Sequence, residues 1–302
     1  MEKEIVGSHP YSQHSSFITG VAISENEGWI VMAMDHMVEQ EQPNAVFGYL
    51  KGPDIEVKHA VGFNTKFAGV LPGSGRDLIA VGEDGDVVVI SQSGMVSEDV
   101  ITVNGMPPGV LARGTIVDGQ VVMVGMGGRV CRREPTGAWV AMEDGLPSEP
   151  DDLTGFWGIA GDSLSSLYAV GFDGAAWKYD GSRWHEMPQP TEDILTAVCV
   201  ADDRSVYAVG REGEMYRAVN DEWQALETEC YEDLWSVTCF QGEIYAASLY
   251  HLYKLNPAGA LEAIDPLGCP CYGPFSACPQ ALWTVGQKAV LSYDRKEWAH
   301  LA

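Results

Sequence analysis

Short apolar runs follow one another along the whole chain, and clusters of Gly, Asp, Asn and Ser separate them. This alternation is typical of β-strands joined by tight turns, and helix signals are weak throughout. Two neighbouring stretches show a unit of four such runs. The first unit comprises residues 156–161, 166–174, 176–181 and 183–187, and the second comprises residues 195–200, 205–213, 214–218 and 222–226. We therefore expect an all-β protein built from a repeated four-stranded unit.

The second run of the unit recurs seven times and marks the repeat. In most copies it ends in Val-Gly, and the aligned positions are Ala33, Gly82, Gly125, Gly171, Gly210, Ser248 and Gly286. Successive markers lie 38 to 49 residues apart. Repeats of about 40 to 50 residues with four strands each are typical of a β-propeller blade. The sequence predicts a seven-bladed β-propeller of four-stranded antiparallel blades.

The chemistry of the unit explains its glycines and its tryptophans. A glycine after the second run has no Cβ where the central strand meets a tight turn, and the Asp-Gly or Glu-Gly that follows supplies positive φ. The fourth run often carries a tryptophan, at Trp184, Trp223 and Trp298. We expect these indoles to cover the seams between neighbouring blades.

The repeats leave only the N-terminus unassigned. The first repeat starts near Phe17 and the last ends at Leu301, and no Pro-rich or Ser-rich linker divides them. We therefore expect one domain over residues 16–302. Residues 1–15 are predicted to form an N-terminal arm, or a strand that helps to close the ring.

The repeated unit of Trp, Tyr-Ala-Val-Gly, Tyr-Asp-Gly and Trp resembles the degenerate propeller repeats of bacterial proteins and, more loosely, WD-repeat propellers. The resemblance covers nearly the whole chain, and it implies the fold rather than the function, because propellers include binders, scaffolds and enzymes. The Ser-x-Asp-x-Gly-x-Thr-Trp box of sialidase-type propellers is absent, and so is the Ala-x-Asp-x-x-Thr-Gly-x-x-x-Trp pattern of quinoprotein propellers. These absences argue against a glycosidase and a quinone-dependent dehydrogenase.

Net charge narrows the class of partner. The chain has 302 residues, with 18 Lys plus Arg against 43 Asp plus Glu, a formal net charge of −25. A polyanion is repelled by nucleic acid and by anionic membranes, so we expect neither as a partner. The N-terminus lacks the pattern of a secretory signal, and no apolar stretch approaches the length of a membrane span. These features predict a cytoplasmic protein.

Cysteine usage agrees with that compartment. The seven cysteines are odd in number and irregularly spaced, which differs from a disulfide framework and predicts reduced thiols. Cys269 and Cys271 form the one close pair, but no second pair of ligands accompanies them as a zinc site requires. We expect neither a metal ion nor a cofactor.

Acidic residues crowd onto one face of the predicted propeller. That face carries the loops from each fourth strand to the next first strand, together with the loops between second and third strands. The densest acidic loops, 143–152 and 227–233, each lead into an aromatic residue at the start of a first strand. The candidate partner-binding residues are Glu143, Asp144, Glu149, Asp151, Asp152, Trp157, Glu192, Asp193, Glu229, Glu232, Asp233 and Trp235.

A negative face with aromatic residues at its rim suits the capture of a basic protein, because it steers the partner and then anchors it. In these respects the chain resembles bacterial immunity proteins, which neutralise a cationic toxin domain such as a nuclease or another effector. Three alternatives remain: acidic loops that only maintain solubility, a general interaction scaffold, and a carbohydrate-binding or carbohydrate-active propeller that uses Trp157 and Trp235 as stacking platforms. No Gly-x-Ser-x-Gly, Walker or dinucleotide motif occurs, so we do not expect an enzyme.

Overall fold

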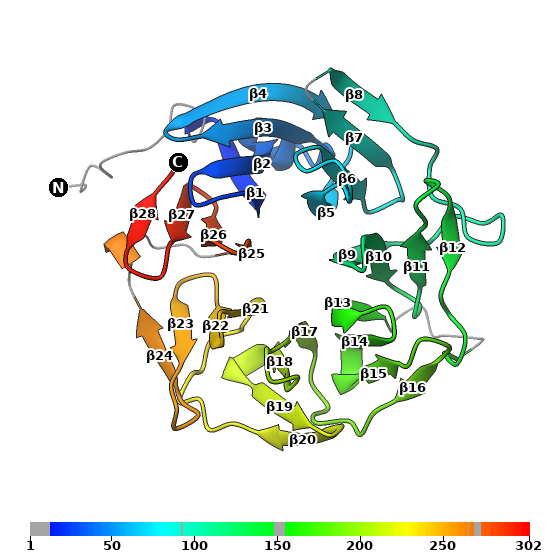
Figure 1. Ribbon diagram of the computed structural model, residues 1–302, viewed down its shortest axis with the longest axis vertical. Coiled ribbons are helices and arrows are strands. Elements are labelled where there is room, and N and C mark those ends of the chain that lie inside the picture. Colours follow the sequence, from blue (N-terminus) through cyan, green and yellow to red (C-terminus); the bar gives the residue numbers. More distant parts are fainter. Residues whose placement is uncertain (1–12, 92, 148–154, 265, 269–272) are drawn as a thin grey trace.

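Seven four-stranded sheets surround a central axis, as the blades of a β-propeller do (Figure 1). The computed structural model describes residues 13–91, 93–147, 155–264, 266–268 and 273–302. All strand pairs within the described sheets are antiparallel, and the four strands of each blade follow one another along the chain. The predicted fold class and blade architecture are therefore confirmed.

The first four blades occupy the N-terminal half of the ring. Blade 1 consists of β1 (Ser15–Ala22), β2 (Glu27–Met34), β3 (Ala45–Lys51) and β4 (Asp54–Val61), and blade 2 of β5 (Thr65–Val70), β6 (Leu78–Gly82), β7 (Val87–Ser91) and β8 (Gly94–Ser97). Blade 3 consists of β9 (Leu111–Val117), β10 (Gln120–Gly125), β11 (Val130–Arg133) and β12 (Trp139–Ala141), and blade 4 of β13 (Phe156–Ser163), β14 (Ser166–Gly171), β15 (Ala176–Tyr179) and β16 (Trp184–Glu186).

The last three blades complete the circle. Blade 5 consists of β17 (Leu195–Val200), β18 (Val206–Gly210), β19 (Met215–Val219) and β20 (Glu222–Ala225). Blade 6 consists of β21 (Ser236–Phe240), β22 (Glu243–Ala247), β23 (Leu252–Leu255) and β24 (Leu261–Ile264), and blade 7 of β25 (Phe275–Ala277), β26 (Leu282–Gly286), β27 (Ala289–Tyr293) and β28 (Trp298–His300). The first strand of every blade lies innermost and the fourth lies at the periphery (Figure 1).

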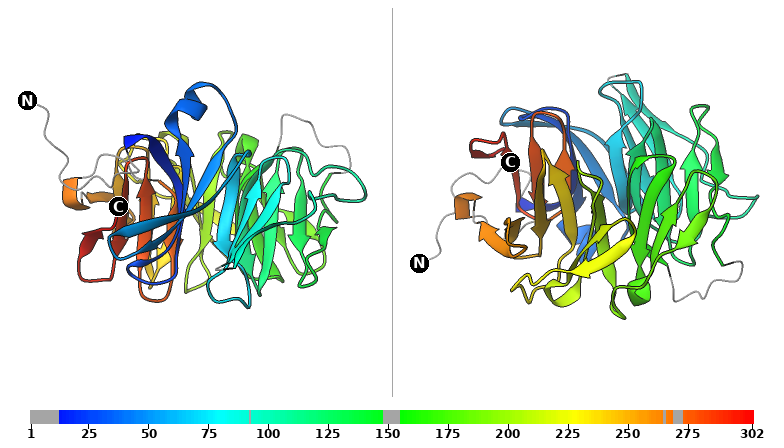
Figure 2. Two further views of the ribbon diagram at one scale, coloured as in Figure 1. Left: turned by 90° about the horizontal axis from the view of Figure 1, so that it is seen from above. Right: turned by 60° about the horizontal axis from the view of Figure 1, so that its bottom comes forward.

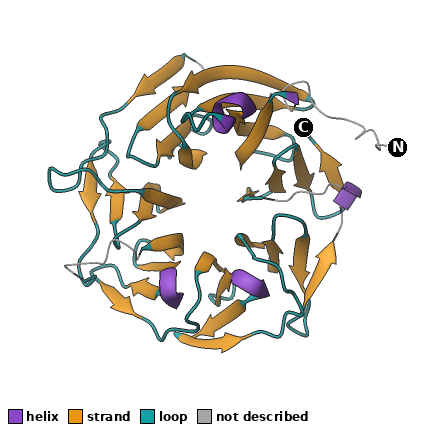
Figure 3. Cartoon of the chain, turned by 180° about the vertical axis from the view of Figure 1, so that it is seen from behind, coloured by secondary structure: helices purple, strands orange, loops and turns teal. Residues whose placement is uncertain are grey.

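Among the few helical turns of the described chain, the one after β2 projects from one end of the ring, and the one after β24 lies at its outer edge (Figures 2 and 3). The helical turns are α1 (Asp35–Glu39), η2 (Phe172–Gly174), η3 (Arg211–Gly213) and η4 (Pro266–Gly268). The first three connect second to third strands, and η4 follows the fourth strand of blade 6. We call the end of the ring that carries these connections the upper end, because antiparallel pairing places both of these loop types on the same side of each sheet.

The repeated Val-Gly ends the second strand because main chain approaches it closely. A Cβ on Gly171 would lie 1.9 Å from the carbonyl oxygen of Gly155, in the connection that enters the same blade. Gly171 itself is extended, whereas Asp173 and Gly174 in the following turn have φ of 53° and 64°. The first glycine of the motif therefore provides space, and the second provides the left-handed conformation.

The fourth-strand tryptophans pack at blade seams, as predicted. Trp184 in blade 4 is buried, and its indole N–H donates to the carbonyl oxygen of Met142 in the connection from blade 3 at 2.7 Å. Trp223 packs against a cluster shared by blades 4 and 5, and Trp298 against one shared by blades 6 and 7. These rings seal the outer part of each seam with apolar surface.

Blades 1 and 7 close the ring through side-chain packing and a few hydrogen bonds. The main-chain N–H of Phe17 donates to the carbonyl of Gln287 at 2.9 Å, and that of Ala22 donates to the hydroxyl of Ser276 at 2.9 Å. Trp283 lies fully buried in the cluster between the two blades. The arm or closing strand expected for residues 1–15 falls mainly in residues 1–12, outside the described residues, and stays a prediction.

Candidate functional site

Exposed carboxylates gather on the loops of the upper end. Eleven of these carboxylates make no ion pair with another described residue of the chain. Carboxylates without such partners keep their charge available to an approaching molecule. They are Glu39, Glu41, Asp84, Asp99, Asp144, Asp173, Glu192, Asp193, Glu212, Glu227 and Glu229.

Most bases near the upper end are already paired. Three of them each hold a carboxylate of the same end, so their charges offset one another. Arg211 is exposed, and among the described residues it has no ion pair. The pairs are Lys66–Glu83 at 3.0 Å, Arg129–Glu143 at 3.3 Å and Lys288–Asp35 at 2.7 Å.

The predicted acidic residues lie on three consecutive connections between blades rather than in one cluster. Asp144 lies between blades 3 and 4 and is exposed, and Glu143 beside it is half-buried against Arg129. Glu192 and Asp193 lie exposed between blades 4 and 5. The remaining predicted acids of this arc are Glu229, Glu232 and Asp233, between blades 5 and 6. Glu149, Asp151 and Asp152 fall outside the described residues.

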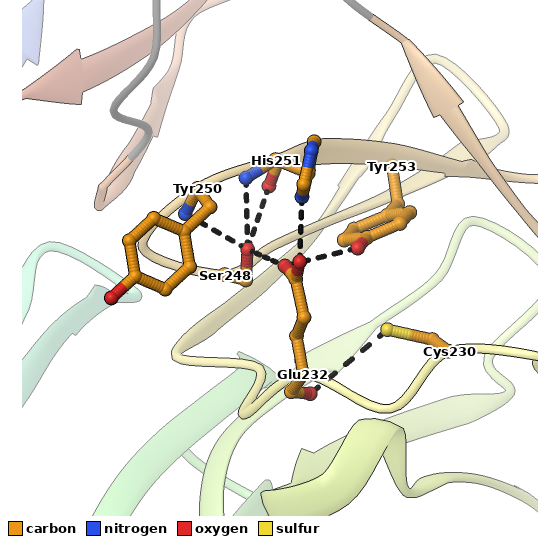
Figure 4. Close-up of polar contacts among 6 residues, drawn as sticks. All are labelled: Cys230, Glu232, Ser248, Tyr250, His251 and Tyr253. Carbon is orange, nitrogen blue, oxygen red and sulfur yellow. Dashed lines mark hydrogen bonds and ion pairs between the residues drawn. The ribbon is translucent and has the colours of Figure 1, made fainter.

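Glu232 is the centre of a hydrogen-bonded cluster that joins two loops of the upper end (Figure 4). Its carboxylate accepts hydrogen bonds from the hydroxyls of Ser248 and Tyr253, the latter at 3.1 Å, and lies 2.7 Å from Nδ1 of His251. Its carbonyl oxygen lies 3.9 Å from the Cys230 thiol. The cluster ties the connection before β21 to the turn between β22 and β23.

The contacts of Glu232 set its charge state. Burial raises the pKa of this carboxyl group, but hydrogen bonds from Ser248, His251 and Tyr253 outweigh burial and leave the pKa below its ordinary value. Burial and the contacts with Cys230 and Glu232 raise the pKa of the Tyr253 phenol, so this hydroxyl remains a donor. Glu232 is therefore an ionised structural group at neutral pH.

Asp233 also has a structural role. Its Oδ1 accepts a hydrogen bond from the main-chain N–H of Glu212 at 3.0 Å, which joins the connection before blade 6 to the η3 turn of blade 5. The two acidic neighbours thus hold loops in place. Exposed acids such as Glu192, Asp193, Glu227 and Glu229 are the ones free to meet a partner.

Exposed apolar and aromatic side chains flank the Glu232 cluster. Tyr231 is 88% exposed, Tyr250 is 64% exposed and Leu249 is 51% exposed. The Tyr250 ring points away from the Glu232 carboxylate (Figure 4). Sequence reasoning passed over both tyrosines; the available signal was their position in upper loops, outside the strand positions where the repeat places its aromatics.

The predicted aromatic anchors Trp157 and Trp235 are half-buried. Trp157 is out of register between Phe156 and Gly158, and its ring lies 5.9 Å from that of Phe172. Its indole nitrogen is buried without a hydrogen-bond partner in the described chain. Neither tryptophan is among the exposed large apolar residues, so the geometry does not favour them as stacking platforms for sugar rings.

Two absences bear on the chemistry of the described residues. They contain no group of three or more His, Cys, Asp and Glu side chains placed to hold a metal ion. No helix among them is long and apolar enough to cross a membrane. The exposed carboxylates together with Tyr231, Leu249 and Tyr250 give the upper end charge and exposed apolar surface, which suit the binding of another macromolecule.

Comparison of sequences finds a curated relative, the immune protein Tsi7 of Pseudomonas aeruginosa. The two chains are 36% identical over 193 residues, which cover 61% of this chain. The aligned region spans 62% of the relative, less than two thirds of its length. No family model matches the sequence.

Comparison of structures finds other propellers at low sequence identity. The WD40 β-propeller domain of Doa1 has a TM-score of 0.69 and 11% identity, over 94% of each chain. YCF48 bound to D1 peptide has a TM-score of 0.66 and 15% identity, over 92% of this chain and 91% of the other. At these identities the similarity supports the fold alone.

Proposed function

We propose that this protein is a cytoplasmic immunity protein, which binds and neutralises a cognate bacterial toxin without catalysing a reaction. The observation that carries the proposal is the 36% identity to an immune protein. The propeller fold supports it, because such rings present loops from many blades as a broad binding surface. The same net charge of −25 disfavours nucleic acid as a direct ligand.

The upper end is the surface we assign to the toxin. Its exposed carboxylates attract a basic protein and accelerate the encounter, an effect that salt weakens. Lys66, Arg129 and Lys288 contribute little opposing charge, since each is paired to a carboxylate of the same end. We therefore expect the toxin surface that docks here to be rich in Lys and Arg.

Tyr231, Leu249 and Tyr250 supply the anchoring surface within this acidic surround. Exposed tyrosines are enriched among residues that dominate the energy of protein interfaces, because they bury large areas at low entropic cost. The Glu232 cluster fixes the main chain of both loops that carry them. A preorganised anchor loses less entropy when its partner binds.

The test begins with affinity capture from the source organism at low salt, elution with rising salt, and mass spectrometry. The captured protein is then co-expressed with this chain, and growth is measured. A single basic protein that is toxic alone and harmless when co-expressed supports the proposal. Many weakly held partners would favour a general scaffold, and a captured protein that is not toxic contradicts the immunity role.

A charge-reversal pair tests the assigned surface. Glu192→Lys, Asp193→Lys and Glu227→Lys together change exposed upper carboxylates that have no ion pair among the described residues. The matched control combines Glu25→Lys, Asp202→Lys and Glu222→Lys, which are exposed in loops or a peripheral strand nearer the lower end. The upper variant is expected to slow association by roughly tenfold or more at low salt, and the control much less. Equal effects would show that only net charge matters.

A further inference from the structure

The inner strands of five blades each contain a register shift near the upper end. A bulge of this kind re-aims one side chain relative to the regular pleat. It occurs in β1, β5, β9, β13 and β17, which makes it a feature of the repeat. The residues left out of register are Ile18, Lys66, Ala112, Trp157 and Thr196.

A cavity of about 310 Å³ lies in the central channel, between the inner strands of all seven blades. Its lining comes largely from the first halves of these strands, next to the upper loops. Among the described residues that line it, the charged ones are Lys66 and Arg113, and none is a carboxylate. The charge of Lys66 is offset by its ion pair with Glu83, so the positive charge of this surface rests on Arg113, in a chain of net charge −25.

Arg113 is held in the channel with most of its hydrogen-bonding capacity unused. Its Nε donates to the carbonyl oxygen of Trp157 in the next blade, at a distance of 3.5 Å. It makes no ion pair with a described residue. Burial lowers the pKa of this guanidinium, and no carboxylate of the described residues offsets that effect. Arg113 is half-buried and lines the open cavity, so its remaining donors are available to an anion there.

Neighbouring donors line the same cavity. The Thr65 hydroxyl is buried and has no hydrogen-bond partner in the described chain. The ammonium group of Lys66 lies 3.0 Å from Glu83 and retains donors beyond that ion pair. The channel thus combines a guanidinium, a hydroxyl and an ammonium group, all of which donate to oxygen.

We propose that the upper part of the central channel binds a small oxyanion, a phosphate or a carboxylate, with Arg113 as its principal ligand. The planar guanidinium offers paired N–H donors that match two oxygens of such a group. Rim carboxylates more than about 8 Å away are largely screened at physiological salt, whereas a contact inside the channel is screened much less. This site goes beyond toxin binding and does not depend on it.

The test is calorimetric titration with sodium phosphate and, separately, with the peptide Gly-Asp-Gly, both at constant ionic strength. Saturable binding of phosphate indicates a free anion, and preferential binding of the peptide indicates a carboxylate borne by a protein. Arg113→Gln is expected to raise the dissociation constant of the preferred ligand by roughly tenfold or more. Arg211→Gln removes an exposed upper-end cation outside the channel and should leave binding unchanged.

Two results would overturn the proposal. One is the absence of binding by either ligand to the unaltered protein. The other is an equal loss in Arg113→Gln and Arg211→Gln, which would indicate general charge screening. Should Arg113→Gln fold poorly, Thr65→Val provides the second variant, because it removes a buried hydroxyl of the same cavity at similar volume. An unchanged affinity in Thr65→Val, when Arg113→Gln cannot be measured, also counts against the site.

Discussion

Nδ1 of His251 lies 2.7 Å from Oε1 of Glu232, and this contact joins two loops that belong to different connections of the ring. Glu232 precedes the first strand of blade 6, whereas His251 lies in the turn between its second and third strands. The pair therefore fixes the upper corner of this blade. The exposed tyrosines proposed as anchors flank this corner.

Glu232→Gln should destabilise the protein by about 1–2 kcal/mol at pH 7, because charge-assisted hydrogen bonds become neutral ones. The folded-state pKa of Glu232 is lowered from 4.5. A carboxylate with a lowered pKa contributes stability above its unfolded pKa, and this contribution is lost as pH falls through the folded value. The difference between the two proteins should therefore shrink below pH 4.5.

Urea unfolding at several pH values measures this difference. Glu227→Gln is the matched control, since Glu227 is exposed and its carboxylate makes no hydrogen bond to a described residue. A constant difference across the acid range would show that the charge of Glu232 is not responsible.

Trp184→Phe should lower the free energy of unfolding by about 1–3 kcal/mol, because it removes a buried hydrogen bond to Met142 and leaves unfilled volume at the seam. Trp223→Phe should lower the free energy of unfolding by a smaller amount. Trp223 is half-buried and its indole nitrogen has no partner among the described residues. Chemical denaturation of both variants gives the comparison, and a larger loss in Trp223→Phe would contradict the role assigned to the indole of Trp184.

Alanine substitutions at two glycines with nearly the same φ distinguish the cost of a steric clash from the cost of backbone strain. A Cβ on Gly174 would lie 1.9 Å from the carbonyl oxygen of Thr191, whereas one on Gly52 would meet nothing within 4 Å. Their φ values are 64° and 60°. Gly52→Ala should cost about 1–2 kcal/mol from its left-handed backbone alone. Gly174→Ala should cost about 1–3 kcal/mol more, since main chain must move.

Thermal or denaturant unfolding of the two glycine variants measures how much stability each one loses. Similar losses would mean that only φ matters at these positions. In that case the close approach between the blade 4 turn and the next connection would not explain the repeated Asp-Gly and Glu-Gly.

Tyr231→Ala and Tyr250→Ala should each weaken toxin binding by about 2 kcal/mol while leaving stability nearly unchanged, since both rings are exposed in the free protein. The change should appear in the dissociation rate, whereas charge reversal should act on the association rate. Val219→Ala is a suitable control, because Val219 is 41% exposed and ends β19 near the lower end. Binding unaffected by both tyrosine changes would place the anchor elsewhere.

The blade architecture was predictable because the repeat imposes the same local chemistry seven times. Gly125 and Gly171 mark where a strand ends against incoming main chain, since a Cβ would lie 2.3 Å and 1.9 Å from a carbonyl oxygen there. Ala33 and Ser248 occupy the same position in blades 1 and 6. Trp184 was predictable for a similar reason, since a tryptophan recurs in the fourth strands β12, β16, β20 and β28. Repetition turns a weak local pattern into a strong one.

The site was less accessible to sequence analysis because its residues interact across loops. Glu232 and Asp233 read as members of an acidic run, but their carboxylates accept hydrogen bonds from Ser248 and from the main chain of Glu212. The bulge at Trp157 could not be recognised in the sequence, because the residues on either side have the pattern of an ordinary strand. Which acids are free for a partner depends on these contacts between connections.

Exposed carboxylates that have no ion pair among the described residues share the upper end with Tyr231, Leu249 and Tyr250, and this arrangement also bears on colloidal behaviour. Mutual repulsion keeps copies of the molecule apart at neutral pH, so this exposed apolar surface can remain uncovered in the absence of its partner. That protection disappears near the isoelectric point of about 4.4. Acidification therefore allows the exposed tyrosine side chains of different molecules to come into contact. It promotes reversible self-association through the upper end of the propeller.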